Sequence, residues 1–288
     1  MRTTGSSDVS AASRNPFLDI VRGLAAFMVL IHHARNLFFI DYRPDIGLFG
    51  KFFYLLTNFG PDAVMVFFIL SGYLVGGSVM RQMEVDRWSW RKYLITRISR
   101  LWVVLLPALV ITAVLDHTGM ALFHTAFYDG NEGNWLLRTP IADALTPSVF
   151  ACNAFFLQTL ECHTFGSDGP LWSLANEFWY YLWFPPIFAL VYRRYRQRNW
   201  IALVLVLITM VLFPSIIIGF GLWLLGALGA ALQRRNHTKF RSITAKLEWP
   251  MLALFVAVLF SSRFLHLSAE AVGLAFFFYF LCLLTTHR

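Results

Sequence analysis

The segment "RGLAAFMVLIHHAR", residues 22–35, is apolar enough to lie in a bilayer, yet Arg22 begins it and His32 and His33 lie near its end. Ionisable side chains at membrane depth are costly, and they usually face the protein interior or a water-filled cavity. The segment therefore predicts a transmembrane helix with one polar side, packed against other helices of a bundle.

The positions of the ionisable residues divide this helix into faces. At 100° per residue, the eleven residues from Arg22 to His33 return to within about 20° of the same face and cover roughly 16 Å, whereas His32 lies about 80° away. Asp19 precedes Arg22 by one turn and is expected to pair with it. Two simpler interpretations stay open: Arg22 can snorkel to the cytoplasmic headgroups, and His33 can be an interhelical hydrogen-bond partner.

The composition of the whole chain agrees with a membrane location. The chain has 288 residues, of which 58% are hydrophobic and 14% are charged. Soluble domains average roughly 45–50% apolar residues and about 25% charged residues. The net charge is +8, but the basic residues form short clusters between apolar runs. This pattern is typical of membrane orientation signals and not of a nucleic-acid-binding face.

Eight segments are apolar enough to be membrane spans, for which about 20 residues are needed. They predict an all-α, polytopic bundle whose two termini lie on the same side of the membrane. The predicted spans are 17–38, 62–80, 93–115, 171–192, 200–214, 215–232, 250–265 and 268–286.

The basic clusters at 81–100, 193–198 and 234–246 all fall on one side under this count, and the acidic 116–170 loop falls on the other. Because Lys and Arg accumulate on the cytoplasmic side, we expect both termini inside the cell and residues 116–170 outside. Residues 1–16 are then a polar cytoplasmic tail without signal-peptide character, and residues 17–288 form one integral membrane domain.

The three cysteines match no zinc-binding spacing, so no metal site is predicted. Cys152 and Cys162 lie in the outer loop, and Cys282 lies in the last span. We favour buried free thiols over a Cys152–Cys162 disulfide, although both interpretations stay open.

The fourth span carries a carboxylate at membrane depth. Glu177 lies six residues, or about 9 Å, from the outer end of "PLWSLANEFWYYLWFP" (170–185), a depth similar to that of His33. An intramembrane glutamate without a local cation needs a distant partner, and His33 is the expected one. Ser173 precedes Glu177 by one turn and shares its face.

Arg97 and Arg100 lie three residues apart in "RISR" (97–100), so they share a helix face at the cytoplasmic end of the third span. Two guanidinium groups on one turn suit bidentate phosphate binding. They can equally be orientation signals.

Four segments together resemble the membrane proteins of acyltransferase family 3. "LDIVRGLAAFMVLIHH" (18–33) resembles its arginine-ten-residues-histidine pattern, and "VFFILSGYLV" (66–75) resembles its FFVLSGFL signature. "RISR" matches its RxxR motif, and residues 170–185 are similar to its WSLSVEEQFYLLFP segment, with Glu177 at the glutamate and Phe178 in place of a frequent second one. The family usually has about ten spans, against the eight counted here.

The resemblance implies an enzyme of the bacterial cytoplasmic membrane that takes an acyl group from cytoplasmic acyl-CoA, acetyl-CoA above all. The implied acceptor is a hydroxyl of an extracytoplasmic glycan, a lipid-linked saccharide or another cell-surface molecule, with membrane lipids around the protein and no nucleic acid bound. A proton-coupled transporter or flippase and a non-catalytic partner in polysaccharide assembly are the alternatives.

The resemblance also implies roles for single residues. Arg97 and Arg100 would hold the phosphates of the donor, and Arg22 would stabilise negative charge on it. His33 would act as general base or as transient acyl carrier, with Glu177 orienting the imidazole or the acceptor. Ser71 and Ser173 are weaker candidates for substrate binding, and helix packing is the alternative for both.

Overall fold

The computed structural model describes residues 16–39, 42–123, 128, 140–191, 195, 199–234 and 238–286. The predicted tail, residues 1–16, lies outside this part of the chain except for Pro16. The described residues contain helices and no strand, as the all-α prediction requires.

The long helices are α1 (Pro16–Phe38), α5 (Trp90–Leu122), α8 (Leu171–Ala189), α11 (Ile217–Arg234), α12 (Thr238–Leu265) and α13 (Ala269–Thr286). A further helical run consists of α3 (Gly60–Ser71), a π-helical turn η1 (Gly72–Gly76) and α4 (Gly77–Glu84). Shorter elements are α2 (Leu48–Thr57), α6 (Ile141–Ala144), α7 (Pro147–Ala154), α10 (Trp200–Leu212) and the 3₁₀ turn η2 (Pro214–Ile216).

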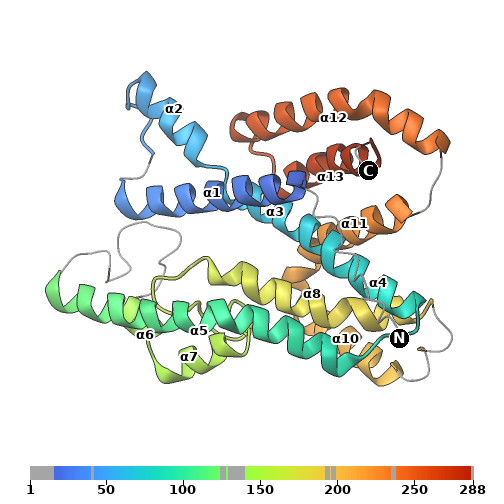
Figure 1. The fold of residues 1–288 in the computed structure, drawn as a ribbon. Coiled ribbons are helices and arrows are strands. Elements are labelled where there is room, and N and C mark those ends of the chain that lie inside the picture. The colour runs from blue at the N-terminus through green and yellow to red at the C-terminus, as the bar shows by residue number, and fades with distance from the viewer. Residues whose placement is uncertain are drawn as a thin grey trace, which may run out of the picture.

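The helical run from α3 to α4 passes through the middle of the molecule (Figure 1). On one side lie α1, α12 and α13, and on the other lie α5, α8 and α10, while α11 packs along α3 and η1. The residues of α3 are mostly buried, because neighbours cover this helix on several sides, whereas α12 has few buried residues. The described core therefore centres on α3, α8 and α11.

Each of the eight segments predicted as spans is mainly helical in its described residues. Six of the described helical segments are long and apolar enough to cross a membrane: 16–38, 48–84, 90–122, 214–234, 241–265 and 269–286. The other two predicted spans correspond to α8, which carries several polar side chains, and to α10, which has only 13 residues. The multi-pass helical architecture is confirmed, and the count of eight spans stays a prediction.

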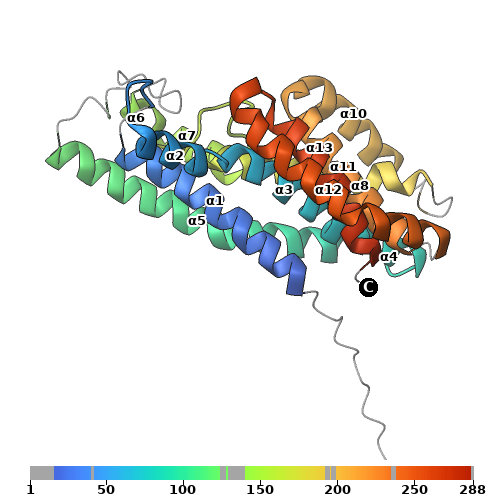
Figure 2. The same cartoon turned by 90° about the horizontal axis from the view of Figure 1, so that it is seen from above.

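Connections predicted on the same side of the membrane share one end of the structure. The helices α2, α6 and α7 lie toward one end of the molecule, and α4 lies toward the opposite end (Figure 2). The helix α2 was not predicted; its apolar sequence, "LFGKFFYLLT", continues the span that follows it.

Glycines allow α3 and η1 to approach α11 closely. A Cβ atom on Gly72 would collide with the backbone carbonyl of Trp223, and one on Gly226 would collide with that of Ile69. Membrane helices associate largely through such small residues, because lipid provides no hydrophobic drive between helices. This contact determines where the side chain of Trp223 lies relative to the end of α3.

The free-thiol interpretation of Cys152 and Cys162 is wrong, because these two residues form a disulfide. The chain turns back after α7, which brings their Cα atoms to 6.5 Å, within the usual range for a bridge. The buried Asn153 amide stabilises the turn by donating to the His163 carbonyl and accepting from the Phe165 N–H. Cys282 is a buried free thiol, as expected.

Candidate active site

One cavity of about 620 Å³ brings together six of the seven candidate residues. Its walls come from α1, α3, η1, α4, α5 and α8. We call it the polar cavity, and its polar and charged candidates are Arg22, Ser71, Arg97, Arg100, Ser173 and Glu177. The residues lie far apart in sequence, so their convergence is a property of the fold.

His33 does not line the polar cavity, but it lies on the helix face that does. Arg22 and Val29 of α1 line the cavity, and His33 follows Val29 by one turn on the same face. His32 faces elsewhere: it is 4% exposed, its ring contacts the backbone of Gly60 at the start of α3, and its Nε2 lies 3.2 Å from the Asn36 side-chain amide. His32 therefore packs against the start of α3, whereas the assignment of His33 to the face of the polar cavity rests on the helical period and stays a prediction.

The Glu177 carboxylate is bound by hydroxyl groups. Its Oε1 atom accepts hydrogen bonds from Ser71 Oγ at 2.6 Å and from Tyr181 Oη at 2.5 Å. No ion pair between Glu177 and His33 is found among the described residues, so the expected partnership is wrong. The reason is that the end of α3 brings Ser71 directly against α8, while the His33 ring packs edge-on against His32 at 5.2 Å.

The π-helical turn η1 begins at the residue after Ser71. Such turns are rare, and they occur mostly as single turns inside α-helices, frequently at functional sites. Here η1 also contributes Leu74 and Val75 to the wall of the polar cavity. The irregular backbone of η1 is therefore adjacent to the predicted site residue Ser71.

The two arginines of α5 differ in their surroundings. The guanidinium of Arg97 lies over the rings of Tyr93 and Tyr181, at 5.6 and 5.7 Å, and is half-buried. Arg100, one turn further, is exposed. Stacking on aromatic faces preorganises a guanidinium, so the Arg97 side chain is held more rigidly than that of Arg100.

The remaining candidates are more exposed or bound locally. Arg22 pairs with Asp19 at 3.6 Å, as predicted, and both side chains remain substantially exposed. Ser173 donates to the Pro170 carbonyl at 3.1 Å, so part of its hydrogen-bonding capacity is used within its own helix start. Within the described residues, no group of three or more His, Cys, Asp or Glu side chains could hold a metal ion.

Sequence reasoning missed Tyr181 and Trp223. Tyr181 follows Glu177 by four residues, so the helical period places it on the same face and could have indicated it. Trp223 lies in α11, which starts more than a hundred residues after Ser71. Its Nε1 donates to Ser71 Oγ at 3.2 Å, and nothing local in the sequence indicates this contact.

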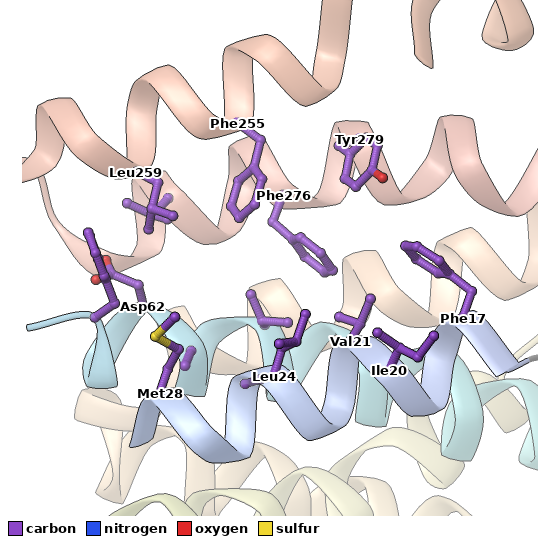
Figure 3. Close-up of a pocket in the computed structure, with 15 residues that line it drawn as sticks. Phe17, Ile20, Val21, Leu24, Met28, Asp62, Phe255, Leu259, Phe276 and Tyr279 are labelled. Atoms are coloured by element: carbon purple, nitrogen blue, oxygen red, sulfur yellow. The ribbon is translucent and has the colours of Figure 1, made fainter. Parts of the chain in front are cut away.

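A second cavity, of about 380 Å³, lies on another face of α1, and we call it the apolar cavity (Figure 3). It is lined by side chains of α1, α3, α12 and α13, among them Leu24, Met28, Leu259 and Phe276. Asp62, which is 2% exposed, is the single charged residue in its wall, and it forms an ion pair with Arg263 of α12.

Comparison with known proteins places this architecture in a family. A family model described as an acyltransferase domain, acyltransferase 3, matches residues 15–288. The chain belongs to the acyltransferase 3 family. This result confirms the resemblance inferred from the four sequence segments, and it agrees with a multi-pass membrane protein.

Three relatives show the range of similarity. An uncharacterized protein of Haemophilus influenzae is 27% identical over 51% of this chain and 56% of its own length. Acyltransferase MdmB of Streptomyces mycarofaciens is 28% identical over 65% of this chain and 42% of its own. The O-acetyl transferase of Shigella phage Sf6 is 27% identical over 57% of this chain and 43% of its own length.

The chain thus spans about half the length of the curated relatives that it matches. No solved structure matches it.

Proposed function

We propose that the protein is a membrane O-acyltransferase that uses cytoplasmic acyl-CoA, with acetyl-CoA as the first donor to test. The observation that carries this proposal is the polar cavity, in which Arg22, Arg97 and Arg100 share one space with the Glu177 carboxylate. Three cationic side chains suit a donor with several phosphates. The relatives named acyltransferase and O-acetyl transferase support the same reaction class.

The distribution of basic residues and the disulfide support an orientation of the protein in the membrane, and with it the sides of the donor and the acceptor. The basic clusters support a cytoplasmic position for both termini and for the Arg97–Arg100 end of the polar cavity. The Cys152–Cys162 bridge supports an oxidising, extracytoplasmic location for the 116–170 loop. We infer a protein of the bacterial cytoplasmic membrane, with the tail 1–16 inside and a single membrane domain over 17–288.

In the proposed reaction, Arg97 and Arg100 bind the phosphates of the donor, and Arg22 stabilises negative charge on it. The acceptor hydroxyl attacks the thioester carbonyl while His33 takes its proton. The imidazolium then gives this proton to the sulfur of the departing coenzyme A, so the products are the acyl ester and free coenzyme A. Glu177 orients the acceptor by accepting a hydrogen bond from it.

The acceptor side of the polar cavity contains Glu177 and Ser173, which can bind hydroxyl groups by hydrogen bonds. This chemistry suits a glycan or a lipid-linked saccharide, and the phage relative's O-acetyl transferase name agrees with an oxygen acceptor. The family assignment favours this enzyme over a transporter or a non-catalytic partner.

The donor assignment is tested by calorimetric titration of the purified protein with acetyl-CoA. The double substitution Arg97→Ala/Arg100→Ala should weaken binding at least tenfold, because hydrogen bonds to charged groups contribute about 1.5–3 kcal/mol each. Lysine at both positions should recover only part of the affinity, since it loses the bidentate geometry.

The matched control is Arg91→Ala/Lys92→Ala, which removes the same charge from exposed positions of α5 that do not line the polar cavity. Equal affinity in the two double variants would contradict the proposed donor site. Absence of acetyl-CoA binding by the unsubstituted protein would contradict the proposed donor altogether.

A further inference from the structure

We propose that Tyr181 and Trp223 are positioning residues for Glu177, and that Ser71 transmits the effect of Trp223. The proposal rests on the proposed function, in which Glu177 contacts the acceptor. It assigns to Ser71 a role in orienting the carboxylate instead of the direct substrate contact considered from the sequence.

The hydrogen-bond directions within this group are determined by the chemistry of its members. The indole N–H of Trp223 can only donate, so Ser71 Oγ must accept from it. The single hydroxyl proton of Ser71 then points to Glu177 Oε1 at 2.6 Å. The Tyr181 hydroxyl donates to the same oxygen at 2.5 Å, so both hydroxyl protons are committed to one carboxylate oxygen.

The second carboxylate oxygen of Glu177, Oε2, differs from Oε1 in its hydrogen bonding. Among the described residues no hydrogen bond to Oε2 is found, and the Glu177 side chain lines the polar cavity. A carboxylate held by two donors on one oxygen keeps its other oxygen available to a bound substrate. The arrangement therefore fixes the rotamer of Glu177 while leaving one oxygen to act on the acceptor.

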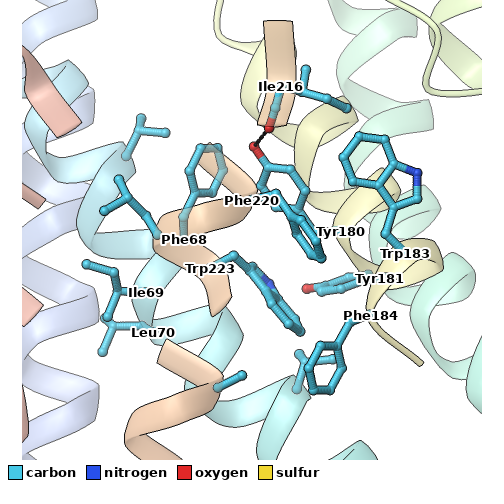
Figure 4. Close-up of a cluster of buried hydrophobic side chains, with 14 of the residues drawn as sticks. Phe68, Ile69, Leu70, Tyr180, Tyr181, Trp183, Phe184, Ile216, Phe220 and Trp223 are labelled. Atoms are coloured by element: carbon cyan, nitrogen blue, oxygen red, sulfur yellow. Dashed lines mark hydrogen bonds between the residues drawn. The ribbon is translucent and has the colours of Figure 1, made fainter. Parts of the chain in front are cut away.

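The supporting scaffold is rigid. Trp223 is fully buried, and the glycine contacts between α3, η1 and α11 hold its helix against the end of α3. Figure 4 shows Trp223 and Tyr181 beside one another in the aromatic core, with Phe184 and Phe220 around them. Aromatic packing on this scale leaves the indole few alternative orientations.

The same core contains a matched control for each proposed residue. Tyr180 is the neighbour of Tyr181 in α8, and its buried hydroxyl donates to the Ile216 carbonyl at 3.1 Å (Figure 4). Trp183 is as buried as Trp223, and its N–H donates to Thr209 Oγ1 at 2.9 Å. Neither Tyr180 nor Trp183 lines the polar cavity.

The experiment compares the four single substitutions Tyr181→Phe, Tyr180→Phe, Trp223→Phe and Trp183→Phe in the full-length protein. Each removes one buried hydrogen-bond donor and keeps an aromatic ring. Tyr181→Phe also retains the ring under Arg97, so donor binding is not disturbed. The readouts are kcat, KM for the acyl acceptor, the Kd of acetyl-CoA and the melting temperature.

We expect kcat to fall on the order of tenfold to a hundredfold for Tyr181→Phe, since a hydrogen bond to a charged group is lost. Trp223→Phe should lower kcat severalfold, and both control variants should stay within about twofold. The Kd of acetyl-CoA should not change in any of the four. Ser71→Thr, which keeps a hydroxyl, should retain more activity than Ser71→Ala.

Coupling to Glu177 provides the decisive comparison. If Tyr181 acts through this carboxylate, adding Tyr181→Phe to a Glu177→Gln variant should cost much less than it does in the unsubstituted protein. Equal losses for Tyr181→Phe and Tyr180→Phe, or full additivity with Glu177→Gln, would overturn the proposal. Failure of the unsubstituted protein to transfer acyl groups would instead overturn the proposed function.

Discussion

The polar and apolar cavities lie on different faces of the same two helices, α1 and α3. They differ in whether their charged side chains form ion pairs within the protein. In the apolar cavity the single acidic residue, Asp62, is neutralised by Arg263. In the polar cavity, Arg97, Arg100 and Glu177 face a common space, and no ion pair joins them to one another or to other described residues. A buried and paired charge such as Asp62 is structural, whereas charges that face a cavity without an ion-pair partner are available to ligands.

The histidine pair of α1 provides the strongest test of this comparison. His33 continues the face of the polar cavity, so His33→Ala should lower the rate of acyl transfer on the order of 10²- to 10⁴-fold, the usual cost of losing a general base. His33→Gln should be equally inactive, because glutamine cannot take the proton. Rates of transfer from acetyl-CoA, normalised to folded protein, provide the measurement.

The control is the adjacent His32→Ala, which changes the same residue type on the face that packs against α3. It should lower the melting temperature and keep most of the activity. If His32→Ala were inactive and His33→Ala nearly normal, the division of α1 into faces would be wrong.

The buried ion pair of the apolar cavity should affect stability and not catalysis. Asp62→Ala leaves Arg263 without its partner, so the free energy of unfolding should fall by about 3–5 kcal/mol. Replacing both residues by Leu and Met should recover much of this loss, because no uncompensated charge remains. Thermal unfolding in detergent and acyl transfer per folded molecule are measured together, and a large loss of transfer rate without loss of stability would contradict the assignment.

The glycine contact between α3 and α11 should have a smaller effect. In Gly72→Ala the new methyl group meets the Trp223 carbonyl, and overpacking of this kind costs about 1–3 kcal/mol. Gly221→Ala, in the same interface helix α11 but facing open space, should leave stability equal or slightly higher. Equal melting temperatures for the two variants would show that the close approach is unimportant.

The smallest effect is expected outside the membrane, where two carboxylates lie near one another. Burial and the negative charge of Asp116 raise the pKa of Asp168 from 3.8 to about 6, although a hydrogen bond with Thr112 opposes the change. The folded state therefore binds more protons than the unfolded state between about pH 4 and pH 6, and stability should fall as the pH rises through this window.

Asp168→Asn removes the charge and should raise the free energy of unfolding by about 1 kcal/mol at pH 7, or about 3 °C in melting temperature. At pH 4 the substituted and unsubstituted proteins should melt at nearly the same temperature. A difference that is the same at both pH values would exclude ionisation as its cause.

The sequence was sufficient for the long helices and for six polar and charged residues of the polar cavity. Apolar length predicted the helices, and helical periodicity placed Arg22 and His33 on one face because both signals are local. Arg97, Arg100 and Glu177 stood out because charge within an apolar run is rare. Asp62, in contrast, looked like an ordinary acidic residue at the start of a predicted span.

Most contacts that the sequence could not predict join residues far apart in the chain; the disulfide instead depends on a local turn. The Ser71–Glu177 and Trp223–Ser71 hydrogen bonds depend on how α3, α8 and α11 pack, and no periodicity encodes this packing. The Cys152–Cys162 disulfide depends on the turn after α7, whose backbone includes the positive φ angles of Phe156 and Thr159. Composition alone does not indicate such a turn.

The π-helical turn η1 makes the number of residues in this span part of the site. A π turn has i→i+5 hydrogen bonds in place of i→i+4, so it contains one more residue than an α turn. The wider turn accommodates this residue with little rotation between α3 and α4, so deleting one residue between Gly72 and Gly76 would restore a regular helix in nearly the same rotational register. Such a deletion would instead shorten the part of the wall that η1 supplies, where Leu74 and Val75 face the polar cavity and Gly72 and Gly76 meet α11. The extra residue of the π turn thus lets one stretch of helix face a cavity and a close helix contact together.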